Sequence, residues 1–355
     1  MKTAIVLGTR PEIIKLAPII KKLGKNSSII FTGQHYDYDM SLQFIEQLGL
    51  PKPDFSLKIS KNNPSQQMGE IIIKLSKILP KIQPETVIVQ GDTNTVLAAS
   101  ISSLKSKIPV SHVESGLRSF DWRMPEEHNR IATDHISELL FAPTKNSQKN
   151  LKNERVHGKI FVTGNTVIDS INMYSKISAK KSSLDLLYNE YILMTLHRAE
   201  NVDNKSTLSS IINAVLKADA DFIFPVHPRT IKRLKEYNLY KKLKNSKNVI
   251  LLNSVGYFEI LELMKNCSFI LSDSGGIQEE ATASSIRKKV LVLRKTTDRP
   301  ESVKDGFSTV IGTQESKILK NIKKTMDTPV IKSRNNPFGK GNSSEKIIKI
   351  LKTNF

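Results

Sequence analysis

Short apolar runs that end in polar, glycine-containing turns alternate with helical segments along almost the whole chain. The stretch Phe269–Glu280, which reads F-I-L-S-D-S-G-G-I-Q-E-E, shows this pattern most clearly. Strands that alternate with helices favour parallel sheets, and the carboxyl ends of parallel strands lie along one rim. The sequence therefore predicts an α/β fold whose functional residues follow its strands.

The turn at Ser274, Gly275 and Gly276 has a composition that suits a phosphate. Glycines let the main chain approach an anion, and the N–H groups of a following helix point at it. Glu280, one turn further along, could reach a ribose hydroxyl. Any α/β domain contains strand-to-helix turns of similar composition, so this stretch alone leaves an ordinary turn as the alternative.

The N-terminal strand Thr3–Leu7 leads into a second turn that could hold an anion. Thr9 and Glu12 match a capping box, which explains how the next helix begins. Helix capping leaves Arg10 unexplained. Arg10 at the helix start and Lys15 about one turn later form an arrangement able to bind an anion.

Two successive predicted strands each deliver a carboxylate. Asp92 follows Thr86–Gln90 and Glu114 follows Val110–Val113, so we expect both side chains at the same rim. Asp92 could instead cap the next helix. Glu126 opens a later helix, where an acidic side chain also has a structural explanation in the helix dipole.

In the second half, histidines follow two predicted strands. His197 comes after Tyr191–Leu196, and His227 comes after Asp221–Val226. Neither histidine has the i,i+4 or carboxylate spacing of a metal site, and we expect no metal. An anion contact by His197 is the preferred interpretation, whereas His227 could equally be a packed loop residue.

The chain of 355 residues is long enough for two domains. We expect two doubly wound Rossmann-like domains facing a central cleft, over residues 1–174 and 186–335. A linker at about Ser175–Asp185 would separate them, and residues 336–355 would form a C-terminal loop and helix.

Composition narrows the class of protein. The net charge is +20, yet the lysines are spread through the chain without interleaved aromatics, so no specific nucleic-acid partner is expected. A nucleic-acid-binding protein is the alternative from another class, and a salt-dependent gel shift without turnover would support it. No apolar run is long enough to span a membrane, and we expect a cytoplasmic protein. A single cysteine excludes internal disulfides.

The residues at the rims suggest chemistry on a nucleotide-linked substrate. The chain has neither a G-x-G-x-x-G fingerprint nor a P-loop, so no nicotinamide cofactor is expected. With a nucleotide sugar, positive groups would stabilise the departing diphosphate while a carboxylate moves a proton at carbon.

Nine motifs in order resemble the non-hydrolysing UDP-N-acetylglucosamine 2-epimerases and extend over nearly the whole chain. They are G-T-R-P-E-I-I-K (Gly8–Lys15), G-Q-H-Y (Gly33–Tyr36), G-D-T (Gly91–Thr93), H-V-E-S-G-L-R (His112–Arg118), P-E-E-H-N-R (Pro125–Arg130), T-G-N (Thr163–Asn165), H-R-A-E-N (His197–Asn201), S-D-S-G-G-I-Q-E-E (Ser272–Glu280) and T-D-R-P-E (Thr297–Glu301).

The resemblance implies a GT-B-like homodimer without a cofactor. It also implies reversible conversion of UDP-GlcNAc to UDP-ManNAc, for surface glycan (polysaccharide) synthesis, through loss of the C2 proton and elimination and re-addition of UDP. The implied catalytic residues are Asp92, Glu114, Glu126 and His197, and the implied UDP-sugar contacts are Arg10, Lys15, Ser274, Gly275, Gly276, Glu280 and Arg299.

Three related activities are alternatives. A hydrolysing epimerase would release free ManNAc, but such proteins tend to carry R-A-E-Y-G where this chain has Arg10-Pro11-Glu12-Ile13-Ile14. A 2-epimerase of a modified UDP-sugar, such as a diacetamido uronic acid, would carry the same motifs. A GT-B glycosyltransferase would share the fold but need an acceptor, and the paired carboxylates favour epimerisation.

Overall fold

The chain folds into two compact units, each built on its own parallel sheet. The structure is a computed structural model that describes residues 1–33, 38–59, 63–182, 184, 190–328, 331, 333 and 335–355. The first unit comprises Met1–Ser170 and Phe338–Phe355, and the second comprises Ile171–Pro337. Three residues of the G-Q-H-Y motif, Gln34, His35 and Tyr36, lie outside the described residues.

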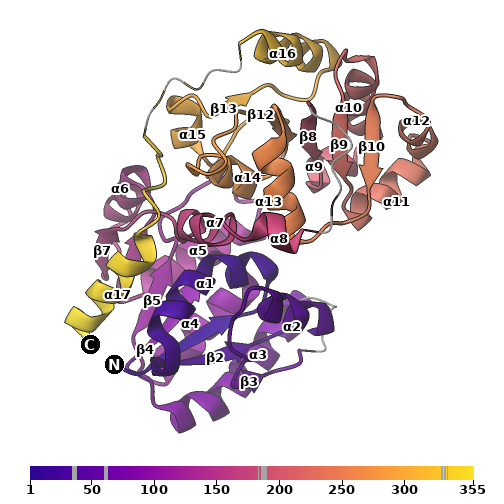
Figure 1. The fold of residues 1–355 in the computed structure, drawn as a ribbon. Coiled ribbons are helices and arrows are strands. Elements are labelled where there is room, and N and C mark those ends of the chain that lie inside the picture. Colours follow the sequence, from indigo (N-terminus) through magenta and orange to yellow (C-terminus); the bar gives the residue numbers. More distant parts are fainter. Residues whose placement is uncertain are drawn as a thin grey trace. The chain divides into compact units, whose positions relative to one another are not determined.

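The first unit contains a seven-stranded sheet in the order β3-β2-β1-β4-β5-β6-β7, with every adjacent pair parallel (Figure 1). Its strands are β1 (Thr3–Leu7), β2 (Ser27–Phe31), β3 (Phe55–Ser56), β4 (Thr86–Gln90), β5 (Val110–Val113), β6 (Leu139–Ala142) and β7 (Lys159–Val162). Its helices are α1 (Arg10–Leu23), α2 (Tyr38–Gln47), α3 (Pro64–Ile82), α4 (Asn94–Lys105), α5 (Pro125–Ile136), α6 (Lys145–Asn153) and α17 (Ser343–Asn354), with a 3-10 turn, η1, at Gly24–Asn26. Helix α7 (Thr166–Tyr174) begins in this unit and ends in the second.

Central strands buried on both faces organise the first unit. Every residue of β1 and β4 is buried, as expected for parallel strands covered by helices on both sides. Ile71, Leu75 and Leu79 recur every four residues along α3, so they form one buried stripe that joins this core.

The second unit repeats the arrangement with six strands in the order β10-β9-β8-β11-β12-β13, again all parallel. Its strands are β8 (Ile192–Thr195), β9 (Phe222–Pro225), β10 (Val249–Leu252), β11 (Phe269–Ser272), β12 (Val290–Val292) and β13 (Ser308–Val310). Its helices are α8 (Ser178–Lys181), α9 (Ala199–Val202), α10 (Lys205–Lys217), α11 (Pro228–Glu236), α12 (Tyr240–Lys244), α13 (Tyr257–Asn266), α14 (Gly275–Glu280), α15 (Pro300–Lys304) and α16 (Glu315–Asp327).

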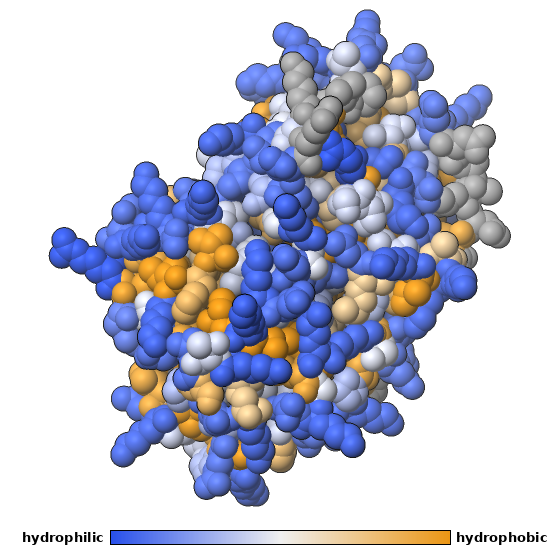
Figure 2. All heavy atoms as spheres, turned by 60° about the vertical axis from the view of Figure 1, so that its left-hand side comes forward, coloured by the Kyte–Doolittle hydropathy of each residue, from blue (hydrophilic) through white to orange (hydrophobic). Residues whose placement is uncertain are grey.

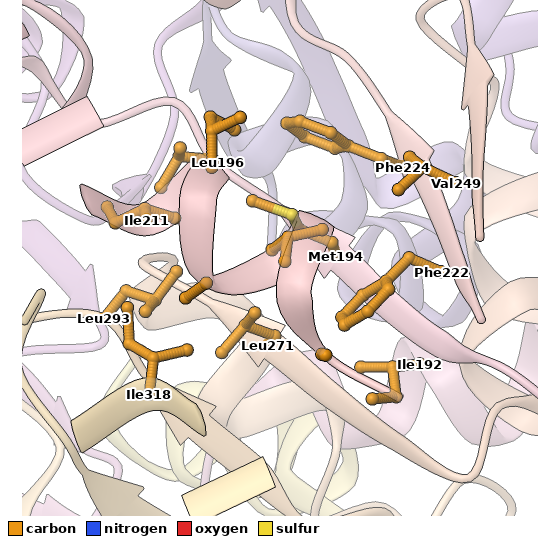
Figure 3. Packing of buried hydrophobic residues seen from close by; sticks show 14 of the residues in the cluster. Ile192, Met194, Leu196, Ile211, Phe222, Phe224, Val249, Leu271, Leu293 and Ile318 are labelled. Atoms are coloured by element: carbon orange, nitrogen blue, oxygen red, sulfur yellow. The ribbon is translucent and has the colours of Figure 1, made fainter. Parts of the chain in front are cut away.

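The core of the second unit gathers side chains from neighbouring strands and the helices over them. Met194 of β8, Phe224 of β9 and Leu271 of β11 are each fully buried in one cluster, and Ile211 of α10 and Ile318 of α16 join them (Figure 3). Since side chains of neighbouring strands and helices interlock here, the turns after β8 and β11 start from rigid positions.

The domain ends differ from those expected from the sequence. The C-terminal segment belongs to the first unit because the carboxylate of Asp169 accepts hydrogen bonds from the N–H groups of Ser343 and Ser344, at 3.1 and 2.8 Å. The stretch expected as a linker contains α8, which packs on α13, and the Ser178 hydroxyl donates a hydrogen bond to Glu262. Residues Ser178–Lys181 of this stretch are therefore helical.

Hydrophilic residues are spread over the surface, as the dispersed lysines of the sequence predict. Hydrophilic residues, drawn in blue, cover most of the face in Figure 2, and apolar residues, drawn in orange, lie between them. Among the described residues, no helix is both long enough and apolar enough to cross a membrane.

Truncating a core leucine should destabilise the second unit strongly. Leu271→Ala removes a fully buried side chain, and we expect the free energy of unfolding to fall by about 2–5 kcal/mol. Met326→Ala is the control, because Met326 is 48% exposed and its loss should change stability by less than about 0.5 kcal/mol. Urea unfolding followed by far-UV circular dichroism measures both, since the single tryptophan, Trp122, lies in the first unit. Equal losses in the two variants would contradict this account.

Candidate functional site

Glu114 stands at the carboxyl end of β5 in an unusual backbone conformation. Its φ is +69°, a left-handed value that non-glycine residues seldom adopt outside constrained sites. The side chain is 8% exposed, and its Oε2 accepts hydrogen bonds from Lys15 Nζ at 2.5 Å and Gln90 Nε2 at 2.9 Å. Lys15, predicted as an anion contact, therefore also holds a predicted catalytic carboxylate.

Asp92 stands at the end of the neighbouring strand, β4, and is held by a different cation. Its Oδ2 accepts a hydrogen bond from Arg130 Nη2 at 2.5 Å, and its backbone carbonyl accepts one from Asn129 Nδ2 at 3.0 Å. Thr93, not Asp92, caps α4, because the N–H of Val96 bonds to the Thr93 hydroxyl. The capping alternative for Asp92 is therefore wrong.

The two glutamates at the start of α5 have different surroundings. Glu127 is 1% exposed and accepts hydrogen bonds from the N–H groups of Ser119 and Phe120, both at 2.9 Å. This structural role belongs to Glu127. Glu126 is exposed, and its predicted catalytic role stays a prediction.

Glu12 connects the turns that follow β1 and β4. Its Oε2 accepts hydrogen bonds from the N–H groups of Gly8 and Thr9, at 2.5 and 3.1 Å, and its Oε1 accepts one from the Thr93 hydroxyl at 2.5 Å. Burial raises the pKa of Glu12 to about 7, because desolvation outweighs these hydrogen bonds. The capping role was predicted, but the bond to Thr93 was missed since it joins residues 81 positions apart.

Arg10 extends to the surface from the same turn. Its side chain is exposed, and its guanidinium lies 4.6 Å from the ring centroid of Phe44 on α2. A guanidinium over an aromatic face keeps its charge while its orientation is restricted. Arg10 thus places a positive charge at the carboxyl end of β1, which fits the predicted anion contact.

In the second unit, a buried aspartate joins the turns after two adjacent strands. Asp273 follows β11, is fully buried, and accepts hydrogen bonds from the N–H groups of His197 and Arg198 and from Asn201 Nδ2, the shortest at 2.9 Å. Sequence reasoning missed this role, although Asp273 stands inside the predicted phosphate turn.

His197 is fixed through its backbone and leaves its ring accessible. The side chain is 42% exposed, and its Nε2 lies 3.9 Å from Asp273 Oδ1. The ring of His227 lies 6.1 Å away between centroids. Burial, together with the charges of His197 and Arg229, lowers the pKa of His227. The neutral ring of His227 is therefore favoured beside His197.

The predicted phosphate turn begins α14. The Ser274 hydroxyl accepts a hydrogen bond from the N–H of Ile277, so Ser274 caps this helix. A β-carbon placed on Gly275 would lie 3.7 Å from Arg198 Nη2 and 3.7 Å from Arg299 Cζ. Asp298 Oδ1 is nearer, at 3.4 Å, so two cationic groups and one carboxylate lie close to this turn.

Arg299 is buried and paired with two carboxylates. It is 7% exposed, with Nε 2.5 Å from Glu279 Oε1 and Nη1 3.0 Å from Asp298 Oδ2. Burial alone would raise the pKa of Asp298, but Arg299, Arg294 and Arg198 outweigh it and hold that pKa well below its usual range. Glu280, at the end of α14, is partly exposed.

Several of the predicted residues therefore lie together in each unit. Lys15, Asp92 and Glu114 follow or face neighbouring strands of the first sheet, and Arg10 shares a turn with Lys15's helix. His197, Ser274, Gly275 and Arg299 surround the turns after β8 and β11. Within the described ranges, no group of three or more His, Cys, Asp or Glu residues could hold a metal ion.

These two sheets and their rim residues define a GT-B-like α/β protein built from two Rossmann-like units. A family model described as UDP-N-acetylglucosamine 2-epimerase matches residues 20–352. The chain therefore belongs to the UDP-N-acetylglucosamine 2-epimerase family, which is a family of isomerases.

Relatives match the chain from end to end. A UDP-N-acetylglucosamine 2-epimerase of Methanocaldococcus jannaschii is 46% identical, over 99% of each chain. The crystal structure of the M. jannaschii UDP-GlcNAc 2-epimerase with UDP-GlcNAc and UDP covers 99% of this chain and 100% of its own, with a TM-score of 0.88. A UDP-2,3-diacetamido-2,3-dideoxy-D-glucuronate 2-epimerase of Pseudomonas aeruginosa is 34% identical, over 99% of each chain.

Glu12 should make the stability of the first unit depend on pH. Its pKa is about 7 in the folded chain against 4.5 for an ordinary glutamate, so the folded chain binds this proton more tightly than the unfolded chain. The stabilising contribution is full below pH 4.5 and is lost as the pH rises through 7, a change of about 3 kcal/mol.

Glu12→Gln removes the titrating group and should lack this component. Urea unfolding at about pH 5 and pH 7.5 measures the difference. Glu46→Gln, at an exposed position, is the control and should retain the wild-type slope. An unchanged pH slope in Glu12→Gln would mean that another group is responsible.

Proposed function

We propose that this chain is a non-hydrolysing UDP-N-acetylglucosamine 2-epimerase that interconverts UDP-GlcNAc and UDP-ManNAc. The observation that carries the proposal is the pair of carboxylates, Asp92 and Glu114, at the carboxyl ends of the adjacent strands β4 and β5. Each is held by a cation, Arg130 or Lys15. Inversion at a carbon needs a proton removed from one face and returned to the other, which two positioned carboxylates can perform.

The proposed reaction has two halves. A carboxylate takes the proton from C2, the C2 electrons form a C1–C2 double bond, and the C1–O bond breaks to release UDP. The products in the site are 2-acetamidoglucal and UDP. Re-addition of UDP at C1 and of a proton at the opposite face of C2 gives the epimer. Asp92, Glu114 and Glu126 are the proposed acid–base groups.

The proposed contacts to UDP come from the cationic and glycine-containing turns. Gly275 and Gly276 would offer N–H groups to the diphosphate, and the Ser274 hydroxyl, which accepts from Ile277, could donate its hydrogen. Arg299 lies close to Gly275. His197, with its exposed ring, would lie beside the diphosphate, and Glu280 would bind the ribose.

The N-terminal turn would add further positive charge at the diphosphate. Arg10 has an exposed side chain. The Lys15 ammonium, which binds Glu114, would place a second positive charge there. Positive groups placed where the departing diphosphate gathers charge lower the barrier to its elimination.

The relatives support UDP-GlcNAc over a modified sugar. The M. jannaschii relative, whose structure is described as a complex with UDP-GlcNAc and UDP, is 46% identical, whereas the P. aeruginosa diacetamido-glucuronate epimerase is 34% identical. We also infer a homodimer in the cytoplasm that supplies UDP-ManNAc for surface polysaccharide synthesis. Light scattering tests the dimer, since one chain has a mass of 39.9 kDa.

The proposed reaction should incorporate deuterium from the solvent at C2 of the sugar. In deuterated water, we expect the purified protein to convert UDP-GlcNAc to UDP-ManNAc with deuterium at C2, because the proton lost to a carboxylate exchanges before it returns. Proton NMR of the sugar detects both changes. Free ManNAc and UDP as the end products would instead indicate a hydrolysing enzyme.

Removing either carboxylate should stop the reaction without releasing the nucleotide. We expect Asp92→Asn and Glu114→Gln each to lower kcat by about 10²–10⁴-fold, with the affinity for UDP retained. Glu138→Gln is the control, because Glu138 precedes β6 at the opposite rim of the same sheet. Near-normal rates in both site variants would reject the acid–base assignment.

A further inference from the structure

A buried histidine contacts the turn of one proposed catalytic carboxylate and shares a strand with the other. His112 lies on β5, two residues before Glu114, and its side chain is fully buried. Its Nε2 is 2.8 Å from the carbonyl oxygen of Gly91, the residue before Asp92, and its Nδ1 is 2.7 Å from Asp134 Oδ1. The proposed mechanism uses none of these contacts directly.

Asp134 completes the connection on the side of Glu114. Its Oδ2 accepts a hydrogen bond from the N–H of Gly116 at 3.0 Å. Gly116 has a φ of +78°, and a β-carbon there would lie 2.4 Å from the carbonyl oxygen of Ser147, so only glycine fits this turn. The His112–Asp134 pair therefore holds the backbone on both sides: at Gly91 before Asp92 and at Gly116 after Glu114.

The neighbours of the ring decide where its protons lie. A carbonyl oxygen can only accept, so Nε2 must carry a hydrogen to bond Gly91. Nδ1 faces a carboxylate oxygen, and a hydrogen must lie between these two atoms as well. Either the ring is doubly protonated and Asp134 is ionised, or the ring is neutral and Asp134 is protonated.

Arg118 selects the ionised form of Asp134. Its Nη2 lies 2.8 Å from Asp134 Oδ2, and its Nε donates to Glu154 Oε1 at 2.7 Å. Burial alone would lower the pKa of Arg118, but the hydrogen bond to Glu154 and the charges of Asp134 and Glu154 raise it. A permanently charged guanidinium beside Asp134 favours the carboxylate over the neutral acid.

We propose that His112, doubly protonated and paired with Asp134, is a positioning residue that fixes the turns carrying Asp92 and Glu114 for proton transfer. The inference rests on the proposed function for the roles of Asp92 and Glu114. A misplacement of about 1 Å can cost a reaction on the order of 100-fold in rate, so a rigid link at these turns acts on kcat. His112 itself is fully buried.

Nitrogen-15 NMR of the histidine rings tests the protonation state without substrate. The chain has seven histidines, and the His112 signals are those that disappear in His112→Gln. At about pH 7.5, we expect both ring nitrogens of His112 in the wild-type protein to carry protons, because each faces an oxygen acceptor. A signal from an unprotonated ring nitrogen of His112 would overturn the proposal.

Asp134→Asn provides the second arm of the test. With its oxygen toward Gly116 and Arg118, the asparagine amide would donate to Nδ1, and we expect that nitrogen to lose its proton while Nε2 keeps the bond to Gly91. A ring that stays doubly protonated in Asp134→Asn would contradict the pairing. If this variant does not fold, the wild-type spectrum still decides.

Kinetics test the positioning role. We expect His112→Gln to lower kcat for UDP-GlcNAc epimerisation by about 100-fold, with KM and UDP affinity little changed. His157→Gln is the matched control, because His157 is 59% exposed and contacts neither turn. Equal kcat values for the two variants would overturn the positioning role. A wild-type protein that epimerises no UDP-sugar would instead contradict the proposed function, and the ring signals would remain interpretable.

Discussion

Parallel strands that are buried on both faces leave their carboxyl ends as the natural place for reactive side chains. β1 and β4 contain only buried residues, and β8 and β11 are equally enclosed. A polar group inside such a strand needs an internal partner, because water cannot reach it. The candidate site residues of both units accordingly lie in the turns and helix starts beyond the strand ends.

Strand β5 shows how buried polar residues are satisfied in the first unit. It carries Ser111 and His112 in the middle of the strand, and both are fully buried. Ser111 is satisfied by the hydroxyl of Thr86 at 2.8 Å, and His112 by Gly91 and Asp134. These internal bonds tie β5 to the adjacent strand β4 and to α5, so the polar residues restrict the position of the rim.

Buried charges at both rims are paired within their own unit. Lys15 binds Glu114 in the first, and Arg299 binds Glu279 in the second. Such pairs add little stability relative to apolar residues of similar size, yet loss of one partner costs about 3–5 kcal/mol. Their value here is a fixed orientation of charge, which is what proton transfer and diphosphate binding both require.

The sequence predicts strong local patterns well and distant partners poorly. Thr3–Leu7 and Thr86–Gln90 were expected as strands and are strands with those bounds, because each is a continuous apolar run ended by a polar turn. The strand β3, with two residues, has no such run and lies within a stretch rich in proline and lysine. It is a strand because it pairs with β2, and its own composition does not predict this pairing.

In the candidate site, too, the sequence predicts local positions but not distant partners. Asp92 and Glu114 could be placed at one rim by strand order alone. Their cations, Arg130 and Lys15, are 38 and 99 residues away in the chain, and no spacing rule connects them. Distant partners are set by how helices pack on the sheet, which depends on the whole core.

The left-handed backbone at Glu114 depends on both its own turn and partners distant in the chain. A non-glycine residue in this region costs of the order of 1–3 kcal/mol and persists only where its surroundings over-determine it. The N–H groups of Glu114 and Ser115 both donate to the carbonyl of Phe141 on β6, at 3.1 and 3.2 Å, while Lys15 holds the side chain. Backbone and side chain are therefore fixed by different elements, so the direction of this carboxylate is a property of the whole sheet rather than of its own turn.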